Sequence, residues 1–180
     1  MGEKLTQREL HRLFLEDISS YAEDIEDTGH KPLRMHLKHP YNRDIKAYIW
    51  NCTAPPGGRT IDEYKVQLIL ENQKRGERGS FDDSDGTVLI VGFAIPLIDQ
   101  NMGLWTLFEL DKHRDFAYSA NIQVYLRQLL KAFETDVYTC QKHNKETVVI
   151  CTRKHLPDAL SKRFSIDLQN KLRRIENGIT

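Results

Sequence analysis

Eight residues near the middle of the chain, Thr87-Val-Leu-Ile-Val-Gly-Phe-Ala94, form a nearly continuous apolar run. Such a run predicts a strand that is buried on both faces. Even when it is extended to Ile98, the run is too short to span a bilayer. We therefore expect it at the centre of a folded domain.

Further strands are predicted on both sides of this run. Apolar and polar residues alternate with a period of two around 33–38 and 45–50, which is typical of half-buried strands. Strands are also predicted at 64–70 and 104–110, and a hairpin at 137–141 and 147–152. Because strands and helices do not alternate, the pattern favours a mostly antiparallel barrel or sandwich over a doubly wound parallel sheet.

Helices are predicted at both ends of the chain and at 125–133. Thr6 and Glu9 form a capping-box pattern, and apolar residues then recur at helical spacing as far as Ile25. The sequence thus predicts three parts: an amphipathic N-terminal helix (1–30), a β domain (31–156) and a C-terminal helix (157–180). The fold class is mainly β with flanking helices, α+β.

Length and composition are those of an ordinary globular protein. The chain has 180 residues, of which 39% are hydrophobic and 29% charged. Three cysteines are too few for a disulfide scaffold or zinc cluster, and the polar first ten residues do not resemble a secretory signal. We expect a cytoplasmic protein with reduced thiols and no membrane segment.

The net charge is zero, which argues against a nucleic-acid-binding protein. Charge is nevertheless segregated along the chain. Residues 1–30 carry 3 basic and 8 acidic groups, whereas residues 31–80 carry 10 basic and 5 acidic groups. Folding either gathers the basic segments on one face or leaves a mixed, solvated surface.

Motifs of catalysis are scarce. The sequence contains no nucleophile elbow, zinc-protease or phosphate-loop motif, and we expect no cofactor or metal. One alternative is a Mg²⁺-dependent nuclease that uses Asp44, Glu63 and Lys65, since Asp/Glu-x-Lys after a separate acid can hold a metal and orient water. The structural explanation for this common triplet is that Glu63 starts a strand.

Two polar segments have a composition suited to DNA recognition. Arg, Asn and Gln read base edges in the major groove, and Lys, Ser, Thr and Tyr anchor phosphates. The alternative is that both are solvated loops. The first segment contains Arg59, Thr60, Lys74, Arg75, Arg78 and Ser80, and the second contains Lys112, His113, Arg114, Tyr118, Ser119, Asn121 and Gln123.

Several motifs together resemble the B3-like DNA-recognition domains of prokaryotic restriction endonucleases, which are similar in fold to plant B3 domains. The resemblance covers roughly residues 31–156. It is carried by Pro55-Pro-Gly-Gly-Arg59, Asp62-Glu-Tyr-Lys-Val-Gln67, Arg75-Gly-Glu-Arg-Gly79, Leu89-Ile-Val-Gly-Phe93 and Phe116-Ala-Tyr-Ser119. It implies a seven-stranded open pseudobarrel that grips the major groove of duplex DNA with two arms. The two polar segments fall where those arms are expected.

The resulting hypothesis is sequence-specific binding of double-stranded DNA as the recognition module of a restriction-modification system. Cleavage then belongs to a nuclease domain or subunit elsewhere. Arg34, Lys38 and Arg43 are further candidates for contacts with the DNA backbone. A third hypothesis is a protein-interaction module that uses the acidic N-terminal helix.

Overall fold

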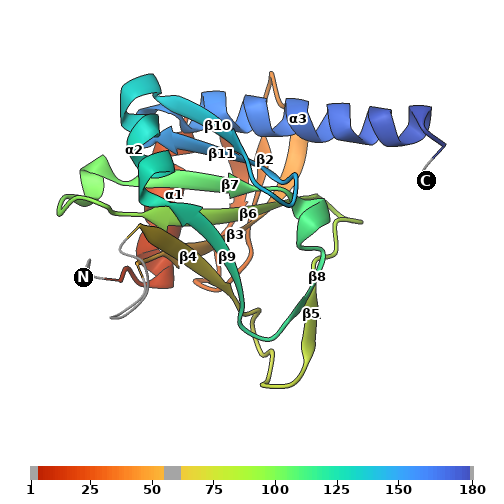
Figure 1. Ribbon diagram of the computed structural model, residues 1–180, viewed down its shortest axis with the longest axis horizontal. Coiled ribbons are helices and arrows are strands. Elements are labelled where there is room, and N and C mark those ends of the chain that lie inside the picture. The colour runs from red at the N-terminus through yellow and green to blue at the C-terminus, as the bar shows by residue number, and fades with distance from the viewer. Residues whose placement is uncertain (1–3, 55–61, 179–180) are drawn as a thin grey trace.

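A mixed seven-stranded sheet forms the centre of the molecule (Figure 1). The structure is a computed structural model that describes residues 4–54 and 62–178. Among the described strands of this sheet, neighbours run antiparallel except β3 and β6, which are parallel. In spatial order the strands are β1 (Ala22–Glu26), β2 (Leu33–Leu37), β3 (Arg43–Cys52), β6 (Thr87–Ala94), β7 (Leu104–Phe108), β11 (Thr147–Thr152) and β10 (Val137–Gln141).

The apolar run at Thr87–Ala94 is the central strand β6, as predicted. Leu89, Val91 and Phe93 point into the core on one face of the sheet. Val88 and Ile90 point into a second core on the other face. The two cores explain why the polar positions that normally alternate along a strand are missing here.

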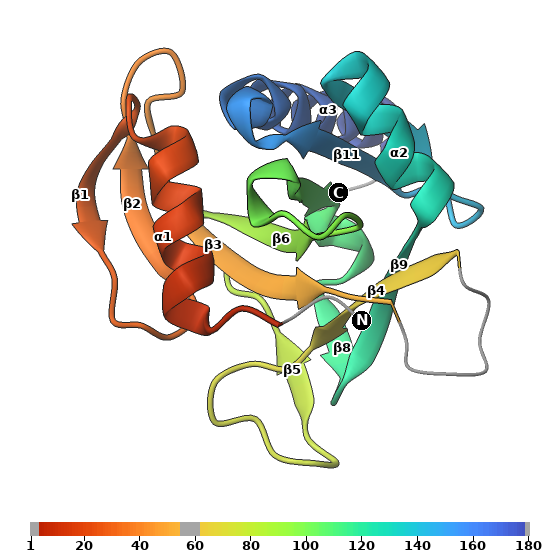
Figure 2. The same ribbon diagram turned by 90° about the vertical axis from the view of Figure 1, so that its left-hand side faces the viewer.

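Two helices cover the first face of the sheet (Figure 2). These are α1 (Gln7–Ile18), which packs against β3, and α3 (Leu156–Glu176), which packs against β11 and β7. Phe14 of α1 meets Trp105 edge to face, with ring centroids 5.4 Å apart. The predicted capping box is present, because Glu9 N donates to Thr6 Oγ1 and Thr6 N donates to the Glu9 carboxylate.

Two short ribbons and helix α2 (Leu126–Thr135) cover the second face. One ribbon pairs β4 (Glu63–Leu68) with β9 (Ala120–Tyr125), and the other pairs β5 (Arg78–Ser80) with β8 (Asp115–Ala117). A backbone bridge between Thr53 and Lys65 ties β4 to the end of β3. In Figure 1 the β5/β8 ribbon lies at the bottom, away from the central sheet. Three 3-10 turns complete the described elements: Gln100–Met102, Leu110–Lys112 and Arg153–His155.

The N-terminal helix is shorter than predicted. It ends at Ile18, and Ala22–Glu26 form the edge strand β1 instead of a further helical turn. The register pairs Glu26 with Arg34 and Glu23 with His36, so cross-strand partners are available to this acidic segment. The helical spacing of Tyr21, Ala22 and Ile25 was a misleading signal, because tertiary pairing overrides periodicity in a short segment.

The expectation of a barrel is wrong, although the α+β class and the seven strands of an open sheet are confirmed. The described edge strands β1 and β10 lie at opposite ends of the sheet and do not pair with each other. Closure is unnecessary here because helices and ribbons already cover both faces.

The other predicted strands and helices lie close to their predicted positions, and the hairpin β10/β11 has the predicted bounds. Strands β5, β8 and β9 were not predicted. No helix within 4–54 or 62–178 is long and apolar enough to cross a membrane.

Candidate nucleic-acid interface

The β4/β9 ribbon presents one polar face to solvent. Val66 and Leu68 of β4 are buried against the central sheet, as are Ile122 and Val124 of β9. Because side chains alternate along a strand, the residues between them point outward. The antiparallel register places Lys65 opposite Gln123 and Gln67 opposite Asn121 on this outer face.

Four of the outward side chains of the ribbon form no side-chain hydrogen bond within the described residues. Gln67 and Asn121 are exposed, and Lys65 and Gln123 are half-buried. Within the described part of the chain, no hydrogen bond engages the side-chain amides of Gln67, Asn121 or Gln123. We call these four residues the ribbon face.

Beyond the ribbon face, a turn projects basic side chains from the molecule. Glu77 N donates to Lys74 O at 3.0 Å, and Gly76 has φ of +89°, the backbone conformation that a type II turn requires at its third residue. This turn leaves Lys74, Arg75 and Arg78 exposed. Tyr118 and Ser119, in the turn between β8 and β9, line the same hollow of about 360 Å³ as Arg75 and Arg78. We call this group the tip.

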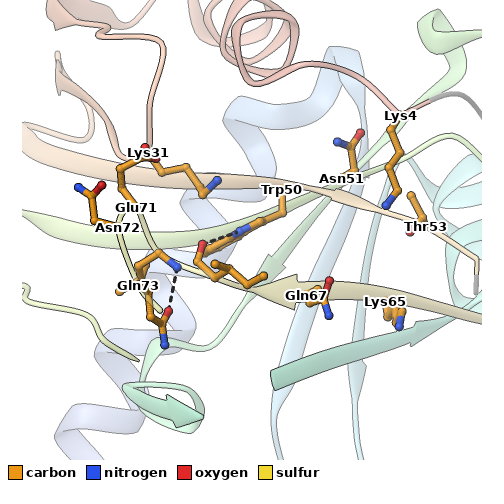
Figure 3. A pocket seen from close by; sticks show the side chains of 12 residues that line it. Lys4, Lys31, Trp50, Asn51, Thr53, Lys65, Gln67, Glu71, Asn72 and Gln73 are labelled. Atoms are coloured by element: carbon orange, nitrogen blue, oxygen red, sulfur yellow. Dashed lines mark hydrogen bonds between the residues drawn. The ribbon is translucent and has the colours of Figure 1, made fainter. Parts of the chain in front are cut away.

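A larger pocket, of about 460 Å³, lies beside the ribbon face (Figure 3). Three lysines from three separate segments line it: Lys4 from the N-terminal segment, Lys31 from the segment before β2, and Lys65 from β4. Figure 3 shows Lys31 and Lys4 entering from two sides, with Gln67 and Lys65 on the strand below them. We call it the lysine pocket.

Hydrogen bonds fix the walls of the lysine pocket. The Asn51 side chain accepts from Leu5 N at 3.0 Å and donates to Leu5 O at 2.8 Å, which holds the N-terminal segment, and with it Lys4, against the end of β3. On the other side, Trp50 Nε1 donates to Ile69 O at 3.4 Å. Lys31 Nζ lies 5.6 Å from the centre of the Trp50 ring.

The charge on Lys31 is held in a partly desolvated position. Burial lowers the pKa of Lys31 below its ordinary value, and the nearby Glu71 carboxylate offsets part of this effect. An ammonium group that has already lost part of its hydration is well placed to gain from a phosphate oxygen.

The structure brings together part of the predicted DNA-binding set. Lys74, Arg75, Arg78, Tyr118 and Ser119 meet at the tip, although they were assigned to two separate arms. Asn121 and Gln123 lie on the ribbon face, and Ser80 is exposed on β5 next to the tip. Arg59 and Thr60 lie outside the described residues.

A second part of the predicted set lies at the other end of the β5/β8 ribbon, and two of its three residues pair with acidic side chains. Arg114 donates to Asp83 at 3.0 Å and to Asp111 at 2.9 Å, and these bonds raise the pKa of the guanidinium. His113 lies 2.6 Å from the buried carboxylate of Glu146. Lys112 precedes both and is exposed. These three residues belong neither to the ribbon face nor to the tip.

The three candidates for DNA-backbone contacts also lie outside the ribbon face and tip. Arg34 pairs with Asp85 at 3.1 Å. The Arg43 guanidinium lies over the Phe164 ring, 4.0 Å from its centre, and Lys38 is exposed in the turn between β2 and β3.

Four residues of the ribbon face and lysine pocket were missing from the predicted binding set: Lys4, Lys31, Lys65 and Gln67. The alternation of Lys65 and Gln67 with Val66 and Leu68 was a usable signal, because it places the two polar residues on one outward face. Lys4 and Lys31 carry no such signal, since tertiary contacts alone bring them to the pocket.

The nuclease alternative is wrong. Asp44 lies at the start of β3, whereas Lys65 is bridged to Thr53, just beyond the end of that strand. The nine steps of extended chain from Asp44 to Thr53 cover about 30 Å. The carboxylates of Asp44 and Glu63 therefore cannot hold one metal ion. Among the described residues, no group of three or more His, Cys, Asp or Glu side chains is arranged to hold one.

Comparison with known proteins identifies the family. The model of a family described as methylase-associated X1 matches residues 43–160, from β3 to the start of α3. The chain belongs to the methylase-associated X1 family. The match includes the ribbon face, the tip and the central sheet from β3 onward; β1 and β2 precede it. Searches among curated proteins and among solved structures give no match.

Proposed function

We propose that this methylase-associated X1 domain binds double-stranded DNA through the ribbon face and the tip. The observation that carries the proposal is the ribbon face itself, where a lysine and three side-chain amides point outward in register. The major groove of B-DNA, about 12 Å wide, admits a two-stranded ribbon, and lysine and amide side chains read base edges there.

The surroundings of the ribbon supply contacts for the DNA backbone. Lys4 and Lys31 lie in the lysine pocket on one side of the ribbon, and Lys74, Arg75 and Arg78 lie at the tip. When a ribbon lies in a groove, the flanking phosphates pass beside it, and basic residues there set its register. The zero net charge of the chain does not oppose this arrangement, because association depends on the local potential.

The biological setting that we propose is a restriction-modification system in which this domain acts beside a methylase. The family description, methylase-associated, supports that partner. DNA recognition is the role that the resemblance to B3-like domains implies. The described strands do not form the barrel that it also implies, so the ribbon face carries the proposal. Both catalytic steps then belong to other domains or subunits.

The test is a selection from a randomised duplex library at roughly physiological ionic strength, near 0.15 M. We expect enrichment of one short motif by the native chain and loss of enrichment by the double variant Gln67→Ala/Asn121→Ala. Gln169→Ala, an amide removed from the exposed face of α3, is the matched control and should enrich the same motif. Equal recovery of all duplexes by the native chain would overturn the proposal.

A further inference from the structure

The chemistry of the ribbon face points to one base in particular. Three of its four side chains, Gln67, Asn121 and Gln123, are amides. An amide presents one donor and one acceptor side by side, which matches the N7 acceptor and N6 donor of adenine in the major groove. The fourth side chain, Lys65, has donors only and matches the O6 and N7 acceptors of guanine.

The register of the ribbon also sets the distance between its two cross-strand pairs. Gln67 and Asn121 form one cross-strand pair, and Lys65 and Gln123 form the next pair on the same face. Residues two apart along a strand are about 7 Å apart. The two pairs therefore meet different bases along the groove.

We propose that the recognised sequence contains an adenine read by the Gln67–Asn121 pair, and that methylation of this adenine at N6 weakens binding. The inference rests on the proposed function and names its ligand more closely. The domain then distinguishes unmodified DNA from DNA that carries the product of an adenine-N6 methylase.

The physical reason lies in the exocyclic amino group of adenine. One of its two hydrogens pairs with thymine, and the other points into the major groove, where an amide oxygen accepts it. In an N6-methylated base pair the methyl group replaces that second hydrogen. The amide oxygen then loses its donor and is left unpaired in a desolvated contact, which is the costly outcome for a polar group. We expect a loss of affinity of about 10- to 100-fold.

The experiment uses the motif from the library selection and compares three duplexes. One is unmodified, one carries N6-methyladenine at a single position, and one carries 7-deazaadenine there, which lacks the N7 acceptor but still pairs with thymine. At one adenine of the motif, both modifications should weaken binding by the native chain about 10- to 100-fold. The control Gln169→Ala should respond as the native chain does.

The variants Gln67→Ala and Asn121→Ala test whether this pair of side chains binds the adenine. They should bind the unmodified motif more weakly and lose most of their sensitivity to both modified bases. Both side chains are exposed, and thermal unfolding checks that the fold is retained.

Two outcomes separate this inference from the function on which it rests. If the library yields no motif, the proposed function fails. If a motif is found but lacks adenine, or if every N6-methylated duplex binds as tightly as the unmodified one, the proposed function stands and the adenine assignment is overturned. Sensitivity that persists in both variants also overturns the assignment.

Discussion

In the proposed interface, individual basic side chains at the tip differ in role from the amides of the ribbon face. Arg75 occupies the second position of the Lys74–Glu77 turn and projects into solvent, where a phosphate is the accessible partner. Gln67 lies on the ribbon itself, where base edges are the accessible partners.

This difference predicts two distinct effects on DNA binding. Arg75→Ala should weaken binding to all duplexes alike and reduce the slope of log affinity against log salt by about one. Gln67→Ala should weaken binding to the selected motif and leave that slope unchanged. Titrations at several salt concentrations measure both quantities. Equal slopes for the native chain and Arg75→Ala would contradict the phosphate assignment.

The buried carboxylate of Glu146, away from the proposed interface, stabilises the folded state. Burial raises its pKa, but the hydrogen bond from His113 and the charge of Lys142 outweigh this effect, so the pKa lies below the ordinary value of 4.5. Glu146 also accepts a hydrogen bond from Glu109 N at 3.1 Å. The ionised form is therefore favoured by folding.

The sign of the pH dependence follows from the lowered pKa. The stabilisation from Glu146 is fully present above pH 4.5 and is lost as the pH falls through the lower folded-state value. Glu146→Gln should reduce the free energy of unfolding by about 2 kcal/mol at neutral pH and make it less dependent on pH below 4.5. Denaturant unfolding at several pH values measures this. Glu134→Gln, at an exposed position on α2, is the control, and an equal loss in both variants would contradict the account.

At the scale of elements, Gly92 explains the one interruption in the hydrophobic side chains of the central strand. A Cβ atom built at Gly92 would lie 2.4 Å from Thr106 Oγ1 and 2.8 Å from Val66 Cγ2. Val66 belongs to β4, so the missing side chain allows the β4/β9 ribbon to pack directly on the sheet.

Replacement of this glycine should disturb the packing of the β4/β9 ribbon on the central sheet. Gly92→Ala should lower the free energy of unfolding by about 1–3 kcal/mol, because short side chains in a packed core cannot move aside without strain. Gly86→Ala is the matched control, since its added Cβ would make ordinary contacts of 3.5 Å or more. Thermal or denaturant unfolding compares the two, and equal stability of both variants would contradict this role for Gly92.

The period-two pattern predicted β2 and β3, and the continuous apolar run predicted β6, because these strands bury one or both faces. The same alternation contained the information for the outward side of β4. The pattern failed at 22–26, where five residues are too few to separate helical spacing from the spacing of an edge strand. Strand pairing was beyond prediction, since β4 and β9 are far apart in sequence and no local signal links them.

For the candidate site, the sequence indicated which basic residues are present but not which of them pair with acidic side chains in the fold. Arg75 and Arg114 look equivalent as lone arginines in polar segments. Folding places Arg114 between two aspartates and leaves Arg75 exposed. Which basic groups remain available for DNA is therefore a tertiary property.

At the scale of the whole molecule, basic side chains from distant segments gather around the β4/β9 ribbon. The lysine pocket and the tip flank this ribbon on the second face, with Glu71 in the pocket and Glu77 in the hollow at the tip. Five basic residues then surround the ribbon face as candidate phosphate contacts: Lys4, Lys31, Lys74, Arg75 and Arg78.

This arrangement predicts a strong salt dependence for a protein of zero net charge. Five phosphate contacts correspond to a slope of log affinity against log salt of about −4.5 on duplex DNA. Affinity measured over a range of salt concentrations gives the slope directly. A slope near zero would mean that the basic residues do not act on the DNA backbone.

The most direct test of the interface follows the side-chain amide groups by NMR during titration with the selected duplex. We predict that the amide signals of Gln67, Asn121 and Gln123 shift or broaden as DNA is added, whereas the signal of Gln169 on α3 stays in place. Changes confined to α3 or the central sheet, with the three ribbon amides unaffected, would contradict DNA binding through the ribbon face.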